Sequence, residues 1–115
     1  MDNPWSRTEL LLGKERVQKL TKARVAVFGV GGVGGFTVEA LARCGVGELV
    51  LVDDDTVAFS NINRQIIATS KTIGKPKVEV AKERVLEINP TAKVTVHKTF
   101  FTPETASQFD FSSYD

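Results

Sequence analysis

The chain has 115 residues, of which 42% are hydrophobic and 25% are charged, as in one ordinary globular domain. Its formal net charge is +1, which gives no argument for a membrane or nucleic-acid partner. Its single cysteine, Cys44, excludes an internal disulfide and a paired-cysteine metal site. No apolar run reaches membrane-spanning length and the amino terminus does not resemble a signal peptide, so we expect no membrane association and a cytoplasmic location.

Two short helices are predicted before the first strand. Ser6 and Glu9 have the spacing of a capping box, which predicts a helix from Ser6 to Leu12. After a glycine, a second helical pattern covers Lys14–Thr21. We expect this lead-in to pack on a sheet or on a partner subunit. Charge alone predicts a solvated side chain for Arg7, which lies in the first helix.

The next stretch predicts two buried parallel strands joined by a glycine turn and a helix. Val25–Phe28 is a continuous apolar run, as in strands that are buried on both faces. It is followed by Gly29–Gly34, which has the G-x-G-x-x-G spacing, and then by a helical pattern. Leu49–Val52 predicts the second strand, which ends on Asp53. The predicted buried face of the intervening helix consists of Val33, Thr37, Ala40, Leu41 and Cys44.

This order of elements is typical of a nucleotide-binding site. Glycines allow a tight turn and a close approach of the backbone to phosphate, and the amino end of the helix offers free N–H groups to an anion. Asp53 is placed to accept hydrogen bonds from ribose hydroxyls. The fold class we predict is α/β, a Rossmann-like, doubly wound and mostly parallel sheet. The alternative is a glycine-rich turn that only packs a helix on a sheet.

Further polar and basic residues follow the second strand. Ser60–Gln65 concentrates hydrogen-bonding side chains in a loop, where Arg64 could clamp phosphate oxygens or simply be solvated. A helix is predicted over Lys75–Ile88. Lys75 and Lys77 lie at its amino end, where the helix dipole disfavours cations, and we favour a phosphate-binding role for Lys77. We predict a strand over 93–98, near a sheet edge, and a short helix over 102–109.

Two functions fit this arrangement. A nicotinamide-dependent dehydrogenase would use the glycine turn and Asp53, but it gives no reason for the Asn-rich loop followed by Lys77. Adenylation of a carboxylate by ATP requires positioning and cationic stabilisation of phosphoryl oxygens, for which Arg64 and Lys77 are suited. The residues therefore favour adenylation.

The segments GVGGVG, LVDDD, SNINRQ and GKPKV resemble the activating-enzyme superfamily, which includes ubiquitin-activating enzymes and the adenylyltransferases of molybdopterin and thiamine biosynthesis. The resemblance runs from about Ser6 to the end of the chain. Within the superfamily the chain is most similar to the tRNA threonylcarbamoyladenosine dehydratases, through SRTELLLG, NINRQIIAT, ERVLEINP and FTPETASQFDF. Such enzymes use ATP to activate the carboxylate of the modified nucleoside, which then loses water and cyclises.

The resemblance implies a role for each matching residue. Asp53 would bind ribose, and Arg7 would reach the phosphates of a neighbouring subunit's nucleotide, which implies a homodimer. The phosphate turn would consist of Gly29, Gly31, Gly32 and Gly34. The residues that contact the triphosphate would be Asn61, Arg64, Gln65 and Lys77, with Arg64, Lys77 and Arg7 as the catalytic set.

The resemblance also implies ATP with Mg²⁺, and tRNA as the substrate. Adenylation of a ubiquitin-like sulfur-carrier protein is the alternative within the superfamily, and a non-catalytic nucleotide-binding fragment is the alternative outside it. We expect residues 1–115 to be the amino-terminal part of an adenylation domain, with 6–21 as a helical lead-in. The chain holds no metal ligand that the family uses, since its magnesium-binding aspartate would follow Asp115. We therefore expect these residues alone to bind nucleotide at best.

Overall fold

The protein is described here by a computed structural model that covers residues 3–115. The strands are β1 (Arg24–Phe28), β2 (Glu48–Val52) and β3 (Lys93–His97), and the helices are α1 (Ser6–Leu12), α2 (Lys14–Lys22), α3 (Gly32–Arg43) and α4 (Lys77–Ile88). Short 3-10 turns occur at Phe59–Asn61, Ala106–Gln108 and Phe111–Ser113. The α/β class and each predicted strand are confirmed.

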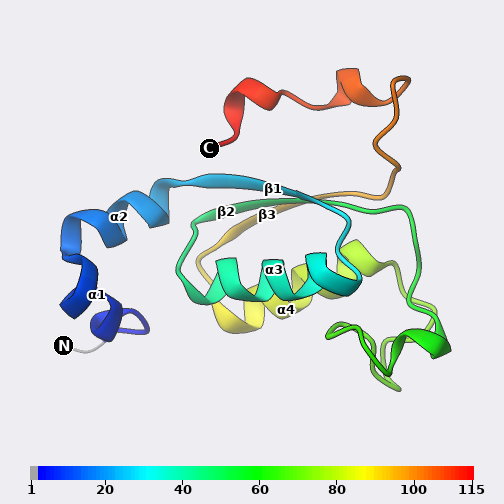
Figure 1. Cartoon of the computed structure of the whole chain (residues 1–115), viewed down its shortest axis with the longest axis horizontal. Helices are drawn as coiled ribbons and strands as arrows, with labels where there is room; N and C mark the ends of the chain where they lie inside the picture. The colour runs from blue at the N-terminus through cyan, green and yellow to red at the C-terminus, as the bar shows by residue number, and fades with distance from the viewer. Residues whose placement is uncertain (1–2) are drawn as a thin grey trace.

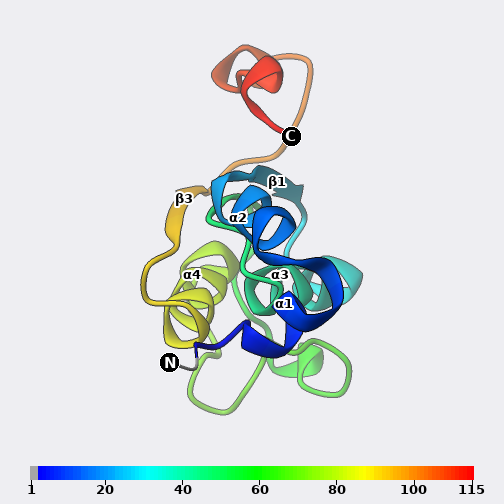
Figure 2. The same cartoon turned by 90° about the vertical axis from the view of Figure 1, so that its left-hand side faces the viewer.

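The three strands form one parallel sheet in the order β1-β2-β3, so β3 lies at an edge as its alternating pattern predicted. Val25 pairs with Leu49, and Leu49 pairs with Val94. Both crossovers step in the same direction, and right-handed connections therefore place α3 and α4 on the same face (Figure 1). The other face is covered by the segment 99–115, and α1 and α2 extend from one end of the sheet (Figure 2).

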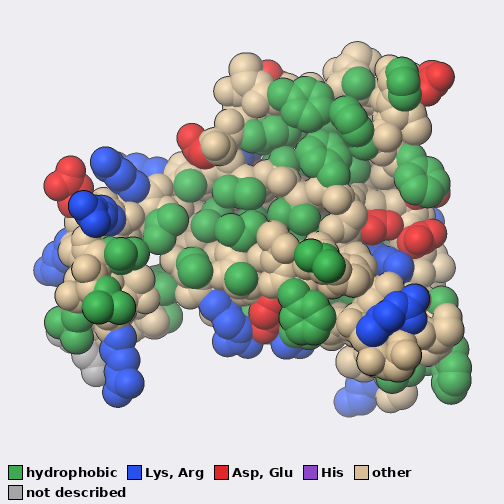
Figure 3. All heavy atoms as spheres, in the orientation of Figure 1, with side chains coloured by type: hydrophobic (Ala, Val, Ile, Leu, Met, Phe, Trp, Pro, Cys, Tyr) green, Lys and Arg blue, Asp and Glu red, His purple; other side chains and the backbone are tan. Residues whose placement is uncertain are grey.

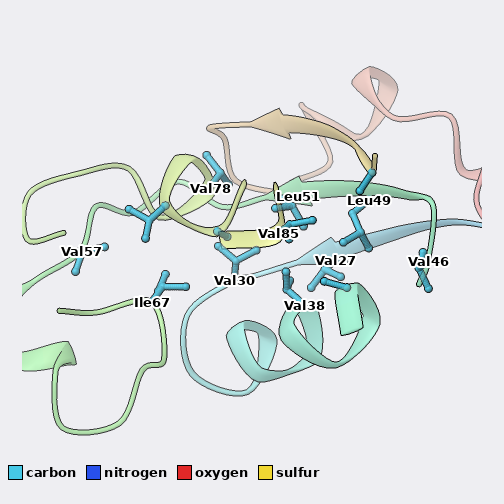
Figure 4. Close-up of a cluster of buried hydrophobic side chains, with 14 of the residues drawn as sticks. Val27, Val30, Val38, Val46, Leu49, Leu51, Val57, Ile67, Val78 and Val85 are labelled. Carbon is cyan, nitrogen blue, oxygen red and sulfur yellow. The ribbon is translucent and has the colours of Figure 1, made fainter. Parts of the chain in front are cut away.

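The main hydrophobic core lies between the sheet and the two crossover helices. Leu49 and Leu51 of β2 point into it and are completely buried (Figure 4). Val38 of α3 meets Val78 and Val85 of α4 in this cluster. Alternate residues of β2, Val50 and Val52, face the opposite way and pack on Phe109. The continuous apolar run of β2 is thus explained by burial on both faces.

The same explanation is wrong for β1, which is a strand but is not buried on both faces. Val27 lies in the main core, whereas the side chain of Phe28 is 40% exposed. The reason is the position of β1, which forms an edge of the sheet within residues 3–115. The second face of β1 meets the segment 99–115, where Phe28 contacts Phe101 and Phe109.

The predicted buried face of α3 is also wrong except at Leu41, which is partly buried and packs against the main core. Val33 is 84% exposed and Cys44 is exposed, whereas Gly35, Val38 and Ala42 are buried. This helix is apolar on nearly every side, so its periodicity could not select a face. Its orientation is fixed instead by the close approach of its first turn to the preceding glycine turn, since a Cβ on Gly35 would lie 3.0 Å from the carbonyl oxygen of Val30.

Two local predictions are wrong because side chains form hydrogen bonds with nearby backbone groups. Ser6 is the first residue of α1 and its Oγ donates to the carbonyl of Asn3, so no capping box forms with Glu9. The predicted helix over 102–109 is replaced by turns and one short 3-10 segment, because Thr102 and Thr105 bond their side chains to nearby backbone groups. No helix within residues 3–115 is long and apolar enough to cross a membrane.

One charged cluster ties α3 to α4. Glu39 of α3 accepts hydrogen bonds from Arg84 of α4 and from Arg43 one turn along its own helix. The hydrogen bond from Arg84 is the main reason that the pKa of Glu39 lies below its ordinary value of 4.5. Burial raises this pKa, and the hydrogen bond from Arg43 lowers it further.

We expect Glu39→Gln to lower the free energy of unfolding by about 0.5–1 kcal/mol at pH 7. Because the folded-state pKa is lowered, the contribution is present above the unfolded value of 4.5 and is lost as pH falls through the lower folded value. Urea unfolding at pH 7 and at pH 3 measures it. A deficit in the variant that is as large at pH 3 as at pH 7 would show that charge pairing is not its cause.

Candidate nucleotide-binding site

The glycine turn lies at the carboxyl end of β1 and leads into α3. Gly29 has a φ of 92°, in the left-handed region that glycine adopts readily, and its N–H donates to the carbonyl of Val52 at 2.7 Å. Gly34 packs directly on this turn, since a Cβ there would lie 1.7 Å from the carbonyl oxygen of Gly29. Gly31 and Gly32 form the amino end of α3, whose first N–H groups lack partners within the helix.

Asp53 fixes the turn against the end of β2. Its Oδ2 accepts the N–H of Val30 at 2.9 Å, and its Oδ1 accepts the N–H of Asp55 at 2.8 Å. Each carboxylate oxygen retains a lone pair, so Asp53 can still accept a hydrogen bond from a ligand hydroxyl. It lies beside a cleft of about 300 Å³. The cleft is lined by Phe28, Gly29, Val52, Asp53, Asp54, Asp55, Thr99, Phe100 and Phe101.

Lys77 and Gln65 meet at the amino end of α3. A Cβ built on Gly31 would lie 3.1 Å from Nζ of Lys77 and 2.9 Å from Oε1 of Gln65. Lys77 is 6% exposed, and Oε1 of Gln65 is buried without a hydrogen-bond partner. A half turn of the Gln65 amide would present its NH₂ group at the same place. We call this arrangement of Gly31, Gln65 and Lys77 the glycine notch.

Asp55 is a site residue that the sequence interpretation did not single out. Its carbonyl accepts the N–H of Lys77 at 3.0 Å, and its Oδ2 lies 3.7 Å from Nζ of Lys77. The signal was present, because Asp53 and Asp55 are two residues apart in extended chain and therefore share a side. A buried ammonium requires a counter-charge, and Asp55 is the carboxylate that supplies it.

The loop that carries Asn61 and Arg64 has two different kinds of side chain. Asn61 is buried, its Oδ1 accepts the N–H of Ala58 at 2.9 Å, and its carbonyl accepts the N–H groups of Arg64 and Gln65. In this geometry Asn61 shapes the loop that delivers Gln65 to the notch. The side chain of Arg64 is exposed, and its Nη1 donates to the carbonyl of Ser60 and to Oδ1 of Asn63.

The remaining candidate, Arg7, is exposed on α1. This helix lies at the opposite end of the molecule from the loop 53–76 (Figure 1). One chain therefore does not bring Arg7 to its own glycine turn. Within residues 3–115 no group of three or more His, Cys, Asp or Glu side chains is arranged to hold a metal ion.

A parallel sheet with a glycine turn after its first strand, a helix amino end at that turn and an acid after the second strand defines a Rossmann-like nucleotide-binding domain. The family model of the ThiF family matches residues 6–115, and the chain therefore belongs to this family.

Relatives of known name are similar over most of this chain. The tRNA threonylcarbamoyladenosine dehydratase of Bacillus subtilis is 50% identical over 95% of the chain and 43% of its own length. A crystal structure of the Escherichia coli tRNA N6-threonylcarbamoyladenosine dehydratase with ATP superposes with a TM-score of 0.88 at 42% identity, over 91% of this chain and 43% of that one. The adenylyltransferase and sulfurtransferase uba4 of Aspergillus niger is 42% identical over 90% of the chain and 21% of its own length. The chain thus spans about two fifths of the dehydratases.

Proposed function

We propose that the protein binds ATP and takes part in the adenylation of a carboxylate. The observation that carries this proposal is the glycine notch, where a buried ammonium and a buried amide face the amino end of a helix. Two sources of positive potential thus converge on one place, the Lys77 ammonium and the amino end of α3. A half turn of the Gln65 amide would add its NH₂ group, an arrangement that suits the phosphates of a nucleotide. The adjoining cleft, beside Asp53, has room for the nucleoside.

In this reaction a carboxylate oxygen attacks the α-phosphorus of ATP, and the bond to pyrophosphate breaks. Negative charge grows on the phosphoryl oxygens and on the leaving group. Lys77 would stabilise that charge from the notch, with Gln65 as a hydrogen-bond donor beside it. Arg64 would first have to release its contacts with Ser60 and Asn63, which are exposed hydrogen bonds and therefore weak. Asp53 would hold the ribose hydroxyls.

The carboxylate that we propose is that of threonylcarbamoyladenosine in tRNA. A group of the same nucleoside would then attack the carbonyl carbon of the mixed anhydride, and AMP would leave. The modified nucleoside would have lost one molecule of water overall. The support is the similarity to the Bacillus subtilis dehydratase, which is 50% identical over 95% of the chain, compared with 42% over 90% for the Aspergillus niger sulfur-transfer relative. Because the chain covers about two fifths of these relatives, the activity, tRNA and the homodimer are all parts of the proposal.

Two further features complete the proposal. The partner subunit in a homodimer would supply the arginine that one chain keeps away from its own notch, since α1 lies at the far end of the molecule. Mg²⁺ would enter with the nucleotide, because the described residues hold no complete set of metal ligands, and we assign no step to it.

The test uses the full-length gene product, because residues 1–115 alone are expected to bind nucleotide at best, with ATP, Mg²⁺ and tRNA carrying threonylcarbamoyladenosine. AMP release together with loss of one water from the nucleoside, by mass spectrometry, would support both reaction and substrate. Pyrophosphate exchange with a sulfur-carrier protein, and none with tRNA, would move the proposal to carrier adenylation. An Arg64→Ala protein with unchanged AMP formation would remove Arg64 from the catalytic set.

We expect Gly31→Ala to weaken ATP binding at least about tenfold, or about 1.4 kcal/mol, because the new methyl group fills the notch. Stability should change by less than about 1 kcal/mol, since the groups it meets are the ends of flexible side chains. Thermal unfolding with and without ATP measures both effects. Val33→Ala, at a side chain that is 84% exposed, is the matched control. A Gly31→Ala protein with a normal ATP shift would place the phosphates elsewhere.

A further inference from the structure

The helices α1 and α2 together carry a net positive charge. Residues 6–22 carry five basic and two acidic side chains, a net charge of +3, whereas the whole chain has +1. Residues 24–98, which form the sheet and its crossovers, carry ten basic and eight acidic side chains, a net charge of +2, whereas residues 99–115 carry three acidic and no basic side chains. Lys and Arg side chains occur at the end of the molecule that α1 and α2 form, and also below its centre and at the opposite end (Figure 3). The uneven distribution among these segments is not visible in the overall charge.

Three of these cations form a continuous face on α2. Arg16, Lys19 and Lys22 follow one another at intervals of three residues, so they lie on successive turns, and all three are exposed. They line an open hollow of about 470 Å³ together with Leu20, Ala23 and Asp115. The one carboxylate of this hollow, on Asp115, already accepts the N–H of Arg24 at 2.8 Å. We call Arg16, Lys19 and Lys22 the α2 basic face.

The α2 basic face forms no close ion pair with the described part of the protein, although Glu15 lies on the same helix four residues before Lys19. In the part of the chain that the structure describes, the ion pairs within 4.0 Å involve Arg24, Arg43, Lys77 and Arg84, and none involves α2. Like charges on neighbouring turns destabilise a helix by about 0.2–0.5 kcal/mol per pair. The helix dipole offsets part of this for Lys19 and Lys22 in the last turn, but not for Arg16 near the beginning.

The face is also held rigidly. Val17 of α2 is buried, and the carbonyl of Leu20 accepts the N–H of Gly47 at 3.1 Å. A Cβ on Gly47 would lie 1.8 Å from the carbonyl oxygen of Thr21, so α2 is seated closely on the loop before β2. The three cations are therefore presented from a fixed helix and not from a mobile tail, which lowers the entropy lost on binding.

We propose that the α2 basic face binds the sugar-phosphate backbone of the tRNA substrate, at the opposite end of the molecule from the glycine notch. Regularly spaced cations on a rigid helix complement the regularly spaced charges of a nucleic-acid backbone. The longest dimension of the molecule is 41 Å. Double-stranded RNA-binding domains contact about 16 base pairs, and the length of such a duplex is of the same order as this dimension. This inference rests on the proposed tRNA substrate.

The test compares two variants of equal charge change. Arg16→Gln, Lys19→Gln and Lys22→Gln together remove the face, whereas Lys71→Gln, Lys93→Gln and Lys98→Gln remove three exposed lysines elsewhere. Binding of fluorescently labelled tRNA is followed by anisotropy from about 50 to 200 mM KCl, the range over which phosphate contacts lose most of their strength. The α2 variant should bind at least about tenfold more weakly, with a salt slope lower by about 1 for each phosphate that it no longer neutralises.

The control variant should bind within about threefold of the wild type, and a charge-preserving variant (Arg16→Lys, Lys19→Arg, Lys22→Arg) should retain affinity, because the contact is electrostatic. Circular dichroism and the ATP-induced thermal shift should be unchanged in all three. Equal losses of tRNA affinity in both neutralised variants, or no loss in the α2 variant, would contradict the assignment of the α2 basic face as the tRNA-binding surface. Either result would leave the proposed substrate unchanged. If the wild type bound no tRNA, or if the α2 basic face preferred phosphatidylserine vesicles, both the assignment of this surface and tRNA as its partner would be wrong.

Discussion

Replacing Lys77 with methionine in the full-length gene product should lower the rate of AMP formation by at least about 100-fold, the loss that follows removal of one preorganised donor from a developing oxyanion. Lys77 is 6% exposed and its Nζ lies at the glycine notch, so the substitution removes a preorganised cation from that place. Methionine keeps the length and apolar stem of the side chain. Without nucleotide the variant should be as stable as the wild type or more stable, because a buried charge is removed.

The matched control for Lys77→Met is Lys75→Met. Lys75 lies two residues earlier and is exposed, so the same chemical change at that position should leave AMP formation within about twofold, as surface substitutions generally do. Initial rates at saturating and limiting ATP separate transition-state stabilisation from ground-state binding. A Lys77→Met protein with a raised KM for ATP and a normal kcat would make Lys77 a binding residue only. Normal values of both would remove it from the site.

The second large effect is expected from Gly34→Ala, which should destabilise the fold by about 3 kcal/mol or more. The added Cβ would lie 1.7 Å from the carbonyl oxygen of Gly29, and both partners are backbone, so no side chain can move aside. Relief would require α3 to move away from the turn, which would open the core where Val38 packs. Urea or thermal unfolding followed by circular dichroism measures the loss.

Gly32→Ala is the control for this prediction, because it makes the same change two residues earlier in the same helix. A Cβ at Gly32 has no heavy atom within 4 Å. Alanine is the better helix former by about 0.5–1 kcal/mol, so this variant should be at least as stable as the wild type. If both variants unfolded alike, helix propensity or local chain entropy would have to replace the close-contact explanation.

The parts of the fold that periodicity and turn chemistry specify were predictable from the sequence. The strands and the helix before Asn89 were predicted in this way. In α4, Val78, Ala81 and Val85 recur at intervals of three and four residues, and all three are buried. Where a helix is apolar on all sides, the pattern no longer selects a face, and α3 was oriented wrongly. Its glycines held the missing information, because only a glycine face permits the contact that Gly34 makes.

The candidate site was predictable to the extent that residue chemistry and chain order determine it. Asp53, Gly31 and Lys77 come together although the last two are 46 positions apart in the sequence, because parallel strands place the ends of their crossovers on one side. Local hydrogen bonding could not be foreseen in the same way. Asn61 bonds to Ala58 inside its own loop, and Arg64 bonds to Ser60 and Asn63, so their predicted contacts with a triphosphate remain predictions.

The unequal cover of the two sheet faces has a consequence for motion. One face is sealed by α3 and α4, whereas Val50 and Val52 on the other meet the segment 99–115 through Phe109 and Tyr114. A segment with so small a buried cluster opens at a lower free energy than the body of the sheet, and therefore far more often. Thr99, Phe100 and Phe101 of this segment line the cleft beside Asp53. Each opening thus removes one side of the nucleoside cleft. The apparent affinity for a ligand in this cleft is therefore reduced by the fraction of molecules in which the segment 99–115 is open.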